Sequence, residues 1–194
     1  MLQNEREKIR NRMLSLREKA PLSMDETEQL TRNFFDSGLV ANKSIIGGLG
    51  LIGGYWPIRK EADPRLIMKQ LEKIGFSIAL PEVVAESNLL KFRFWKHFYP
   101  LQPGFFRTWQ PWKEQALVEP DTFLVPLVAF DLHGYRLGFG SGYYDKTLSV
   151  FRAKKKIVAI GLAREFQKVE LIPRSPNDQR LDYIITENNV EHFK

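Results

Sequence analysis

The stretch VPLVAFDLHGYRLGFGSGYYDKTL, residues 125–148, contains an apolar run, a short turn, a glycine-rich loop and the start of a helix, in that order. Glycine occupies every second position from 138 to 142. Glycine lets a backbone come close to a bound group, and the free amides of a helix N-terminus attract anions. The stretch therefore predicts a strand–loop–helix unit of an α/β fold that binds phosphate.

Two charged residues of the same stretch favour that interpretation. Arg136 carries a planar guanidinium that matches phosphate geometry, and Asp145, in the first turn of the helix, can hold magnesium against phosphates. The spacing of the glycines, however, matches neither the P-loop nor the Rossmann motif. From the pattern alone, a plain strand-to-helix turn with packed tyrosines is an equal alternative.

The rest of the chain alternates between apolar strands and helices. Apolar runs at 76–81, 156–162 and 181–187 predict buried strands, and the patterns at 3–19 and 64–74 predict helices. This alternation indicates an open, mostly parallel sheet with helices on both faces, a three-layer, Rossmann-like α/β fold. Residues 1–194 are expected to form one domain, with ligands at the carboxyl ends of the strands.

Four further segments have local signals. Ser23 and Glu26 have the spacing of a capping box and predict the start of a helix. Residues 89–95 alternate like a strand, and 44–57 predict a glycine-interrupted strand that enters a loop. Residues 97–120 are rich in proline and aromatics without a clear period, so they are a candidate functional loop.

The first predicted helix, 3–19, combines an apolar stripe with basic residues. Arg6, Arg10 and Arg17 project together beside the stripe, where long basic side chains can direct their charged ends into a cleft. The alternative, which spacing alone favours, is a solvated helix face. The stripe consists of Leu2, Ile9, Met13 and Leu16.

Composition narrows the class of protein. The 194 residues include no cysteine, which excludes disulfides and thiolate metal sites. No apolar run is long enough for a membrane span, and the charged N-terminus does not resemble a targeting signal, so we expect a cytoplasmic protein with no membrane partner. The net charge of +6 is spread along the chain, which favours small anionic substrates over nucleic acid.

Residues 125–148 closely resemble the signature of the 5-formyltetrahydrofolate cyclo-ligases, also called 5,10-methenyltetrahydrofolate synthetases. The resemblance extends over nearly the whole chain, from a basic pair in the first helix, through the segments 55–64, 109–111 and 160–167, to 177–187. The matching positions of the signature are Pro126, Ala129, Phe130, Asp131, Gly134, Arg136, Leu137, Gly138, Gly140, Gly142, Tyr143, Tyr144 and Asp145.

The resemblance implies an enzyme that converts 5-formyltetrahydrofolate into 5,10-methenyltetrahydrofolate with ATP and Mg²⁺. In the mechanism that it implies, ATP phosphorylates the formyl oxygen to an iminium phosphate, N10 of the folate attacks the formyl carbon, and ADP and phosphate are released. The expected partners are these small molecules, without nucleic acid, and the expected state is a monomer.

The resemblance also implies roles for individual residues. Tyr143, Tyr144 and Arg136 are the expected catalytic residues, and Asp145 and Asp182 the expected metal ligands. The expected folate-binding residues are Trp56, Glu61, Trp109, Gln110 and Tyr143. The expected ATP-binding residues are Arg6, Arg10, Arg136, Leu137, Gly138, Phe139, Gly140, Ser141, Gly142, Tyr143 and Tyr144.

Some positions depart from the family pattern, and other functions stay open. Arg6 stands where lysine is usual, and Gln110 lacks the common carboxylate. From the residues alone, Trp56 and Trp109 are equally well explained as core aromatics, and Glu61 as a solvated loop residue. The alternative proteins are a sugar-phosphate isomerase or acyl-CoA-type enzyme, a basic nucleic-acid-binding module, and a silent folate-storage protein.

Overall fold

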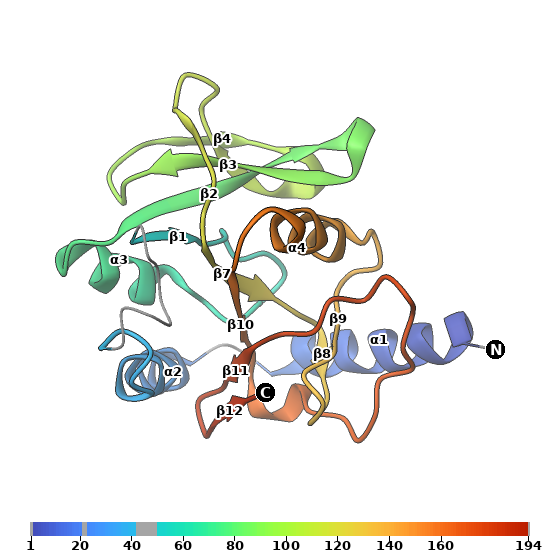
Figure 1. Cartoon of the computed structure of the whole chain (residues 1–194). Coiled ribbons are helices and arrows are strands. Elements are labelled where there is room, and N and C mark those ends of the chain that lie inside the picture. Colours follow the sequence, from blue (N-terminus) through green and yellow to red (C-terminus); the bar gives the residue numbers. More distant parts are fainter. Residues whose placement is uncertain (1, 21–22, 42–49, 194) are drawn as a thin grey trace.

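An eight-stranded sheet runs through the structure, a computed structural model that describes residues 2–20, 23–41 and 50–193 (Figure 1). The strand order is β12-β11-β10-β7-β1-β2-β3-β6. The five inner strands, from β11 to β2, run parallel to one another. The outer strands β12, β3 and β6 are added to the two sides of the sheet by antiparallel pairing. The expected α/β fold with an open, mostly parallel sheet is confirmed.

The strands of this sheet are short, and the central ones are buried on both faces. All five residues of β10 are buried, as are four of the five residues of β7, which explains their continuously apolar sequences. The strands are β1 Leu51–Gly53, β2 Ser77–Val84, β3 Leu89–Trp95, β6 Leu117–Val118, β7 Thr122–Pro126, β10 Val158–Leu162, β11 Tyr183–Ile185 and β12 Val190–His192.

Helices cover both faces of the sheet, as expected. On one face, α2 (Met24–Asp36) and α3 (Arg65–Lys73) pack over an apolar core, and on the other face α4 (Tyr143–Lys154) packs over a second core (Figure 1). The capping box predicted at Ser23 and Glu26 is present at the start of α2. Within the described residues, no helix is long and apolar enough to cross a membrane.

The first helix, α1 (Leu2–Lys19), packs against a small two-stranded sheet rather than the main one. Its residue Met13 joins a third core with Val128 and Leu137. The predicted apolar stripe is only partly buried, because Leu2 and Leu16 are exposed. The small sheet consists of β8 (Ala129–Phe130) and β9 (Arg136–Leu137).

The segment 97–120, for which we expected no regular structure, contains a β-hairpin. Strands β4 (Leu101–Pro103) and β5 (Trp109–Pro111) pair antiparallel. A short 3₁₀ turn, Phe105–Arg107, joins them, and both Phe106 and Arg107 have positive φ angles there. Further 3₁₀ turns are Ala85–Ser87 and Glu165–Gln167. The strand predicted at 44–57 is confirmed only as β1, because 44–49 lie outside the described residues.

Candidate active site

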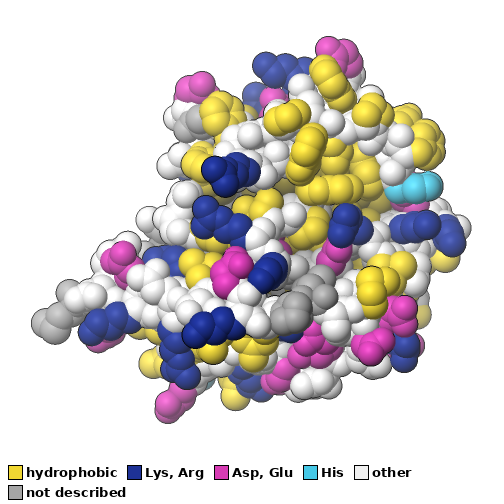
Figure 2. Space-filling view, turned by 180° about the vertical axis from the view of Figure 1, so that it is seen from behind, with side chains coloured by type: hydrophobic (Ala, Val, Ile, Leu, Met, Phe, Trp, Pro, Cys, Tyr) yellow, Lys and Arg dark blue, Asp and Glu magenta, His cyan; other side chains and the backbone are white. Residues whose placement is uncertain are grey.

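A cavity of about 1090 Å³ opens at the carboxyl ends of β1, β2 and β7. This is the edge where ligands bind in open α/β sheets. Its wall includes Arg6 and Arg10 of α1, the glycine loop 138–142 and the start of α4. In Figure 2, hydrophobic side chains gather on the upper part of the molecule, and Lys and Arg side chains lie across the middle.

The glycine loop has the backbone shape that the sequence predicts. Gly140 has a φ of +111° and Gly142, the residue before α4, a φ of +72°, values that side-chain-bearing residues rarely adopt. A Cβ built on Gly140 would lie 3.5 Å from the Arg10 guanidinium carbon. Arg10 Nε in turn donates to the carbonyl of Gly138 at 2.9 Å. The loop amides and the Arg10 guanidinium therefore border the same part of the cavity.

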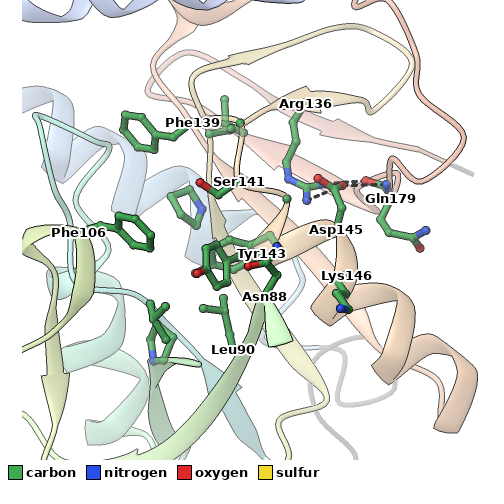
Figure 3. A pocket seen from close by; sticks show the side chains of 18 of the residues that line it. Asn88, Leu90, Phe106, Arg136, Phe139, Ser141, Tyr143, Asp145, Lys146 and Gln179 are labelled. Carbon is green, nitrogen blue, oxygen red and sulfur yellow. Dashed lines mark hydrogen bonds and ion pairs between the residues drawn. The ribbon is translucent and has the colours of Figure 1, made fainter. Parts of the chain in front are cut away.

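Arg136 is buried and fixed by two partners on its cavity side. One Nη donates to Asp145 Oδ1 at 2.9 Å and the other to the carbonyl of Gln179 at 2.6 Å (Figure 3). The amide of Gln179 donates to the same Asp145 oxygen at 2.9 Å. Burial lowers the pKa of Arg136, and the charge of Asp145 opposes that shift. One oxygen of Asp145 thus organises the ion pair, whereas its Oδ2 has no partner among the described residues.

Arg6 reaches the cavity from α1 and is paired there with Asp178. Its Nη1 lies 2.5 Å from Asp178 Oδ2 and also donates to the carbonyl of Pro173 at 2.8 Å. Both side chains of the pair are largely buried, at 12% and 8% exposed. Asp178 and Asp145 both line the cavity, and the negative charge of both carboxylates opposes the lowering of the Arg136 pKa by burial.

Glu61 supplies a buried carboxyl group to the opposite side of the cavity. It is only 4% exposed, and its Oε2 accepts from the Ile58 amide at 2.9 Å. Burial raises the pKa of Glu61 to about 7, while the Ile58 hydrogen bond and the charge of Arg17 act in the opposite direction. Glu61 is therefore not the solvated loop residue that its charged neighbourhood also allowed.

The two tyrosines at the start of α4 connect the two sides. The buried hydroxyl of Tyr144 has no hydrogen-bond partner within the described residues, and burial together with the charge of Glu61 raises its pKa. The hydroxyl is therefore a proton-bearing donor at neutral pH. Tyr143 packs edge-on against Phe106 at the hairpin tip, with 5.8 Å between ring centres (Figure 3).

The two expected folate-binding tryptophans both line the cavity, but in different settings. Trp56 packs edge-on against Trp95, with ring centres 6.0 Å apart, and lies under the Arg65 guanidinium at 5.2 Å. Trp109, on the hairpin, is 45% exposed and so offers a free ring surface.

Three expected site residues do not line this cavity. Leu137 is fully buried in the core beside α1, because β9 pairs with β8 and turns its side chain inward. Gln110 is buried within the hairpin, close to Gly104, and its Oε1 has no partner in the described structure. Asp182 accepts instead from Arg152 and from the Ala159 amide, at 3.2 and 2.7 Å.

The structure adds cavity residues that the sequence analysis missed. Asp178 and Gln179 lie in an irregular segment with no local pattern, four and three residues before Asp182. Both residues belong to the segment 177–187 that resembles the family, but of that segment only Asp182 was expected to be a site residue. Arg59 and Phe106 also line the cavity, and only their nearness to Glu61 and Trp109 could have indicated this.

These features define a class of protein: an α/β enzyme whose cavity places a glycine loop bordered by arginines beside aromatic rings and a buried carboxyl group. Residues 2–187 match the model of the 5-formyltetrahydrofolate cyclo-ligase family. The chain belongs to this family of ligases.

Individual relatives and solved structures agree with the family match. The chain is 26% identical to a 5-formyltetrahydrofolate cyclo-ligase of Mycolicibacterium smegmatis, over 92% of this chain and 91% of that protein. It is 31% identical to the Escherichia coli K12 enzyme of the same name, over 67% and 74%. Its fold is similar to that of a 5,10-methenyltetrahydrofolate synthetase from Aquifex aeolicus, with a TM-score of 0.71 and 29% identity over 97% and 93% of the two chains.

Proposed function

We propose that this protein converts 5-formyltetrahydrofolate into 5,10-methenyltetrahydrofolate at the expense of ATP, with Mg²⁺ and through a phosphorylated formyl group. One observation supports this most directly: a single cavity contains both a glycine loop with three arginines and a buried carboxyl group among aromatic rings. A nucleotide and a folate can therefore meet in it.

The donor set fits a magnesium ion held mainly by phosphates. Mg²⁺ takes oxygen ligands and is commonly bound by one or two carboxylates together with substrate phosphates and water. Asp145 has a free Oδ2 and Asp178 shares its cavity, whereas the described part of the chain has no group of three or more acidic, His or Cys residues placed to hold a metal ion by themselves. Asp145 and Asp178 are the residues that would hold the ion, which would neutralise phosphate charge.

On the nucleotide side, the chain contributes positioning and positive charge. The amides of the glycine loop and the guanidinium groups of Arg6, Arg10 and Arg136 border the space for the triphosphate. Arg136 is held in place by Asp145 before any ligand binds. Preorganised charge of this kind stabilises the developing charge of phosphoryl transfer without further reorganisation.

On the folate side, Glu61 and Tyr144 supply the polar contacts. As a carboxylate, Glu61 accepts hydrogen bonds from the N–H donors of the pteridine. Tyr144, as a phenol, donates to an oxygen of the formyl or phosphoryl group. Trp56 and Trp109 offer ring surfaces to the pteridine and aminobenzoate.

In the proposed reaction, the formyl oxygen attacks the γ-phosphorus of ATP, the bond from this phosphorus to the β,γ-bridging oxygen breaks, and ADP leaves. N10 then attacks the formyl carbon, the carbon–oxygen bond breaks, phosphate departs with the formyl oxygen, and N10 loses its proton. The Glu61 side chain and the Tyr144 hydroxyl are both buried, which limits the access of bulk water to these two groups.

An omission experiment tests the proposal. Purified protein is incubated with 5-formyltetrahydrofolate, ATP and Mg²⁺, and the near-ultraviolet absorbance of the methenyl product is followed. We expect turnover only when all three are present, with one ADP per methenyl group. Full product formation without nucleotide would contradict the ligase function, and binding of folate without any turnover would favour a storage protein.

A further inference from the structure

Two arginine side chains from separate segments meet at the ring of Phe139 beside the cavity. The guanidinium carbon of Arg17, on α1, lies 5.3 Å from the centre of the Phe139 ring, and that of Arg59 lies 5.5 Å from it. Phe139 belongs to the glycine loop, and Arg59 precedes Glu61 by two residues. Phe139 lies at the edge of the cavity near Ser141 (Figure 3). We call this arrangement the Arg17–Phe139–Arg59 stack.

Arg17 depends on the ring because it has few other partners. Its side chain is 1% exposed, one Nη donates to the Leu127 carbonyl at 3.3 Å, and its Nε and Nη2 have no partner within the described residues. Burying a cation with unmade hydrogen bonds is costly, and an aromatic face offsets part of the cost. Burial lowers the pKa of Arg17, and the negative charge of Glu61 opposes this shift and so stabilises the charged form. Arg17 therefore interacts with both sides of the cavity.

Arg59 reaches the ring through an unusual backbone. Arg59 and Lys60 have φ angles of 45° and 58°, a left-handed conformation that two successive non-glycine residues rarely adopt. The Ile58 amide donates to the Glu61 carboxyl group at 2.9 Å and fixes the loop, whereas the ion pair of Lys60 with Glu18 at 3.3 Å is solvent-exposed and contributes little. Strain of this kind persists where surrounding contacts impose it, and it occurs often at functional sites.

The stack also brings two like charges to one ring. The charge of Arg59 opposes protonation of Arg17, so the two guanidinium groups repel each other. Arg59 and Phe139 line the cavity, so a nucleotide bound at the glycine loop would bring negative charge close to the stack and weaken this repulsion. It would therefore favour the arrangement in which Arg59 stays on Phe139 and the loop holds Glu61 in the cavity.

We propose that Phe139 is a positioning residue that couples the two substrates. Through Arg17 and Arg59, a nucleotide at the glycine loop fixes the segment that carries Glu61, and each substrate tightens the binding of the other. Such coupling is reciprocal by thermodynamic necessity. The inference rests on the proposed function, because both substrates must occupy this one cavity.

Calorimetric titrations test the coupling. The Kd of 5-formyltetrahydrofolate is measured with and without the β,γ-imido analogue of ATP and Mg²⁺, and the ratio of the two values is the coupling factor. We expect at least about fivefold coupling in the wild type, at the lower end of typical allosteric coupling. Phe139→Leu and Arg59→Leu should bring the factor close to 1, and the double variant should have no further effect, because both changes remove one contact.

Two matched variants separate positioning from a general disturbance of the loop. Phe139→Tyr keeps the ring face and should keep the coupling. Lys60→Leu removes the same charge from the neighbouring left-handed position, and it should also keep the coupling. Melting temperatures are recorded for all variants, because Phe139→Leu also removes a partner of the buried Arg17.

The outcomes separate this inference from the proposed function. Wild-type turnover with a coupling factor near 1 would overturn the inference and leave the function intact. Coupling that survives in Arg59→Leu, or that is lost equally in Lys60→Leu, would also overturn it. Failure of the folate to bind at all would overturn both.

Discussion

The side of the cavity built by residues 136–145 differs from the side built by 55–61 in how its polar groups are paired. Arg136 is paired with Asp145, Arg6 with Asp178, and Arg10 with a loop carbonyl. Around Glu61 the pairing is incomplete. The Glu61 carboxyl group has one backbone partner, and the hydroxyl of Tyr144, a residue of 136–145 whose pKa is raised by burial and by the charge of Glu61, has none among the described residues.

The difference shows where each side obtains its selectivity. Paired arginines are fixed in advance and suit any polyanion of the right shape, because their charge is already positioned. Buried groups with unmade hydrogen bonds favour a ligand that completes them and reject one that does not. We therefore expect the nucleotide side to control rate and the folate side to control specificity.

The largest effect should follow from changing Asp145. In Asp145→Asn, activity should fall at least about 100-fold, the scale of one lost preorganised charge contact, with partial rescue at high Mg²⁺. The melting temperature should also fall, because buried Arg136 loses its ion-pair partner. The measurement is a Mg²⁺ titration of turnover combined with a melting curve.

Asp182→Asn is the matched control for this prediction. Asp182 also pairs with an arginine, Arg152, but does not line the cavity. The Asp182→Asn change should lower the melting temperature and leave the Mg²⁺ dependence of turnover as in the wild type. The reverse result, a changed Mg²⁺ dependence in Asp182→Asn alone, would assign the metal role to Asp182, the second of the two ligands expected from the sequence.

Glu61→Gln should weaken folate binding and stabilise the protein at alkaline pH. Loss of a hydrogen bond to a charged group should raise the KM for folate about 30-fold, a cost of about 2 kcal/mol. The folded pKa of about 7 lies above the ordinary value of 4.5, so wild-type stability is highest below pH 4.5 and falls as the pH rises to about 7. This difference between the two pKa values corresponds to a loss of about 3 kcal/mol in the free energy of unfolding of the wild type.

Urea unfolding at pH 4.5 and pH 8.5 measures the second part of this prediction. The glutamine variant should match the wild type at the acidic pH and exceed it at the alkaline pH. Folate affinity of the wild type should fall as the pH drops below about 7, because the carboxylate is then protonated. Equal stability of the two proteins at pH 8.5 would show that Glu61 is ionised at no cost.

Gly140→Ala should raise the KM for ATP about tenfold, because a side chain in this conformation costs roughly 1–2 kcal/mol and moves the loop. Gly38→Ala is the control, since Gly38 has a φ of +77° with open space around it and lies outside the cavity. Both variants should lose stability, but only Gly140→Ala should alter ATP kinetics. Unchanged kinetics would mean that the loop is a plain turn.

The smallest effect concerns the hairpin tip. Phe106→Leu should raise the KM for folate only about threefold, because it removes one ring contact with Tyr143. Phe105→Leu, at the exposed neighbouring position outside the cavity, should have no effect on folate kinetics. Equal effects of the two changes would show that the tip acts on the fold of the hairpin rather than on the ligand.

Local sequence signals predicted the elements that local physics determines. The capping box of α2, the apolar strands and the glycine loop before α4 all follow from neighbours in the chain. The pairing of Arg6 with Asp178 joins residues 172 positions apart, so no local pattern could indicate it. The burial of Leu137 away from the cavity was not predicted either, because it follows from the pairing of β9 with β8, where the Val128 amide donates to the Leu137 carbonyl at 2.7 Å.

An isotope experiment tests most directly the claim that the two sides of the cavity meet to transfer a phosphoryl group to the formyl oxygen. The protein is given 5-formyltetrahydrofolate labelled with ¹⁸O in the formyl group, together with ATP and Mg²⁺, and the released phosphate is analysed by mass spectrometry. The account predicts one ¹⁸O atom in each phosphate formed with the methenyl product. Unlabelled phosphate, with the label released as water, would contradict it.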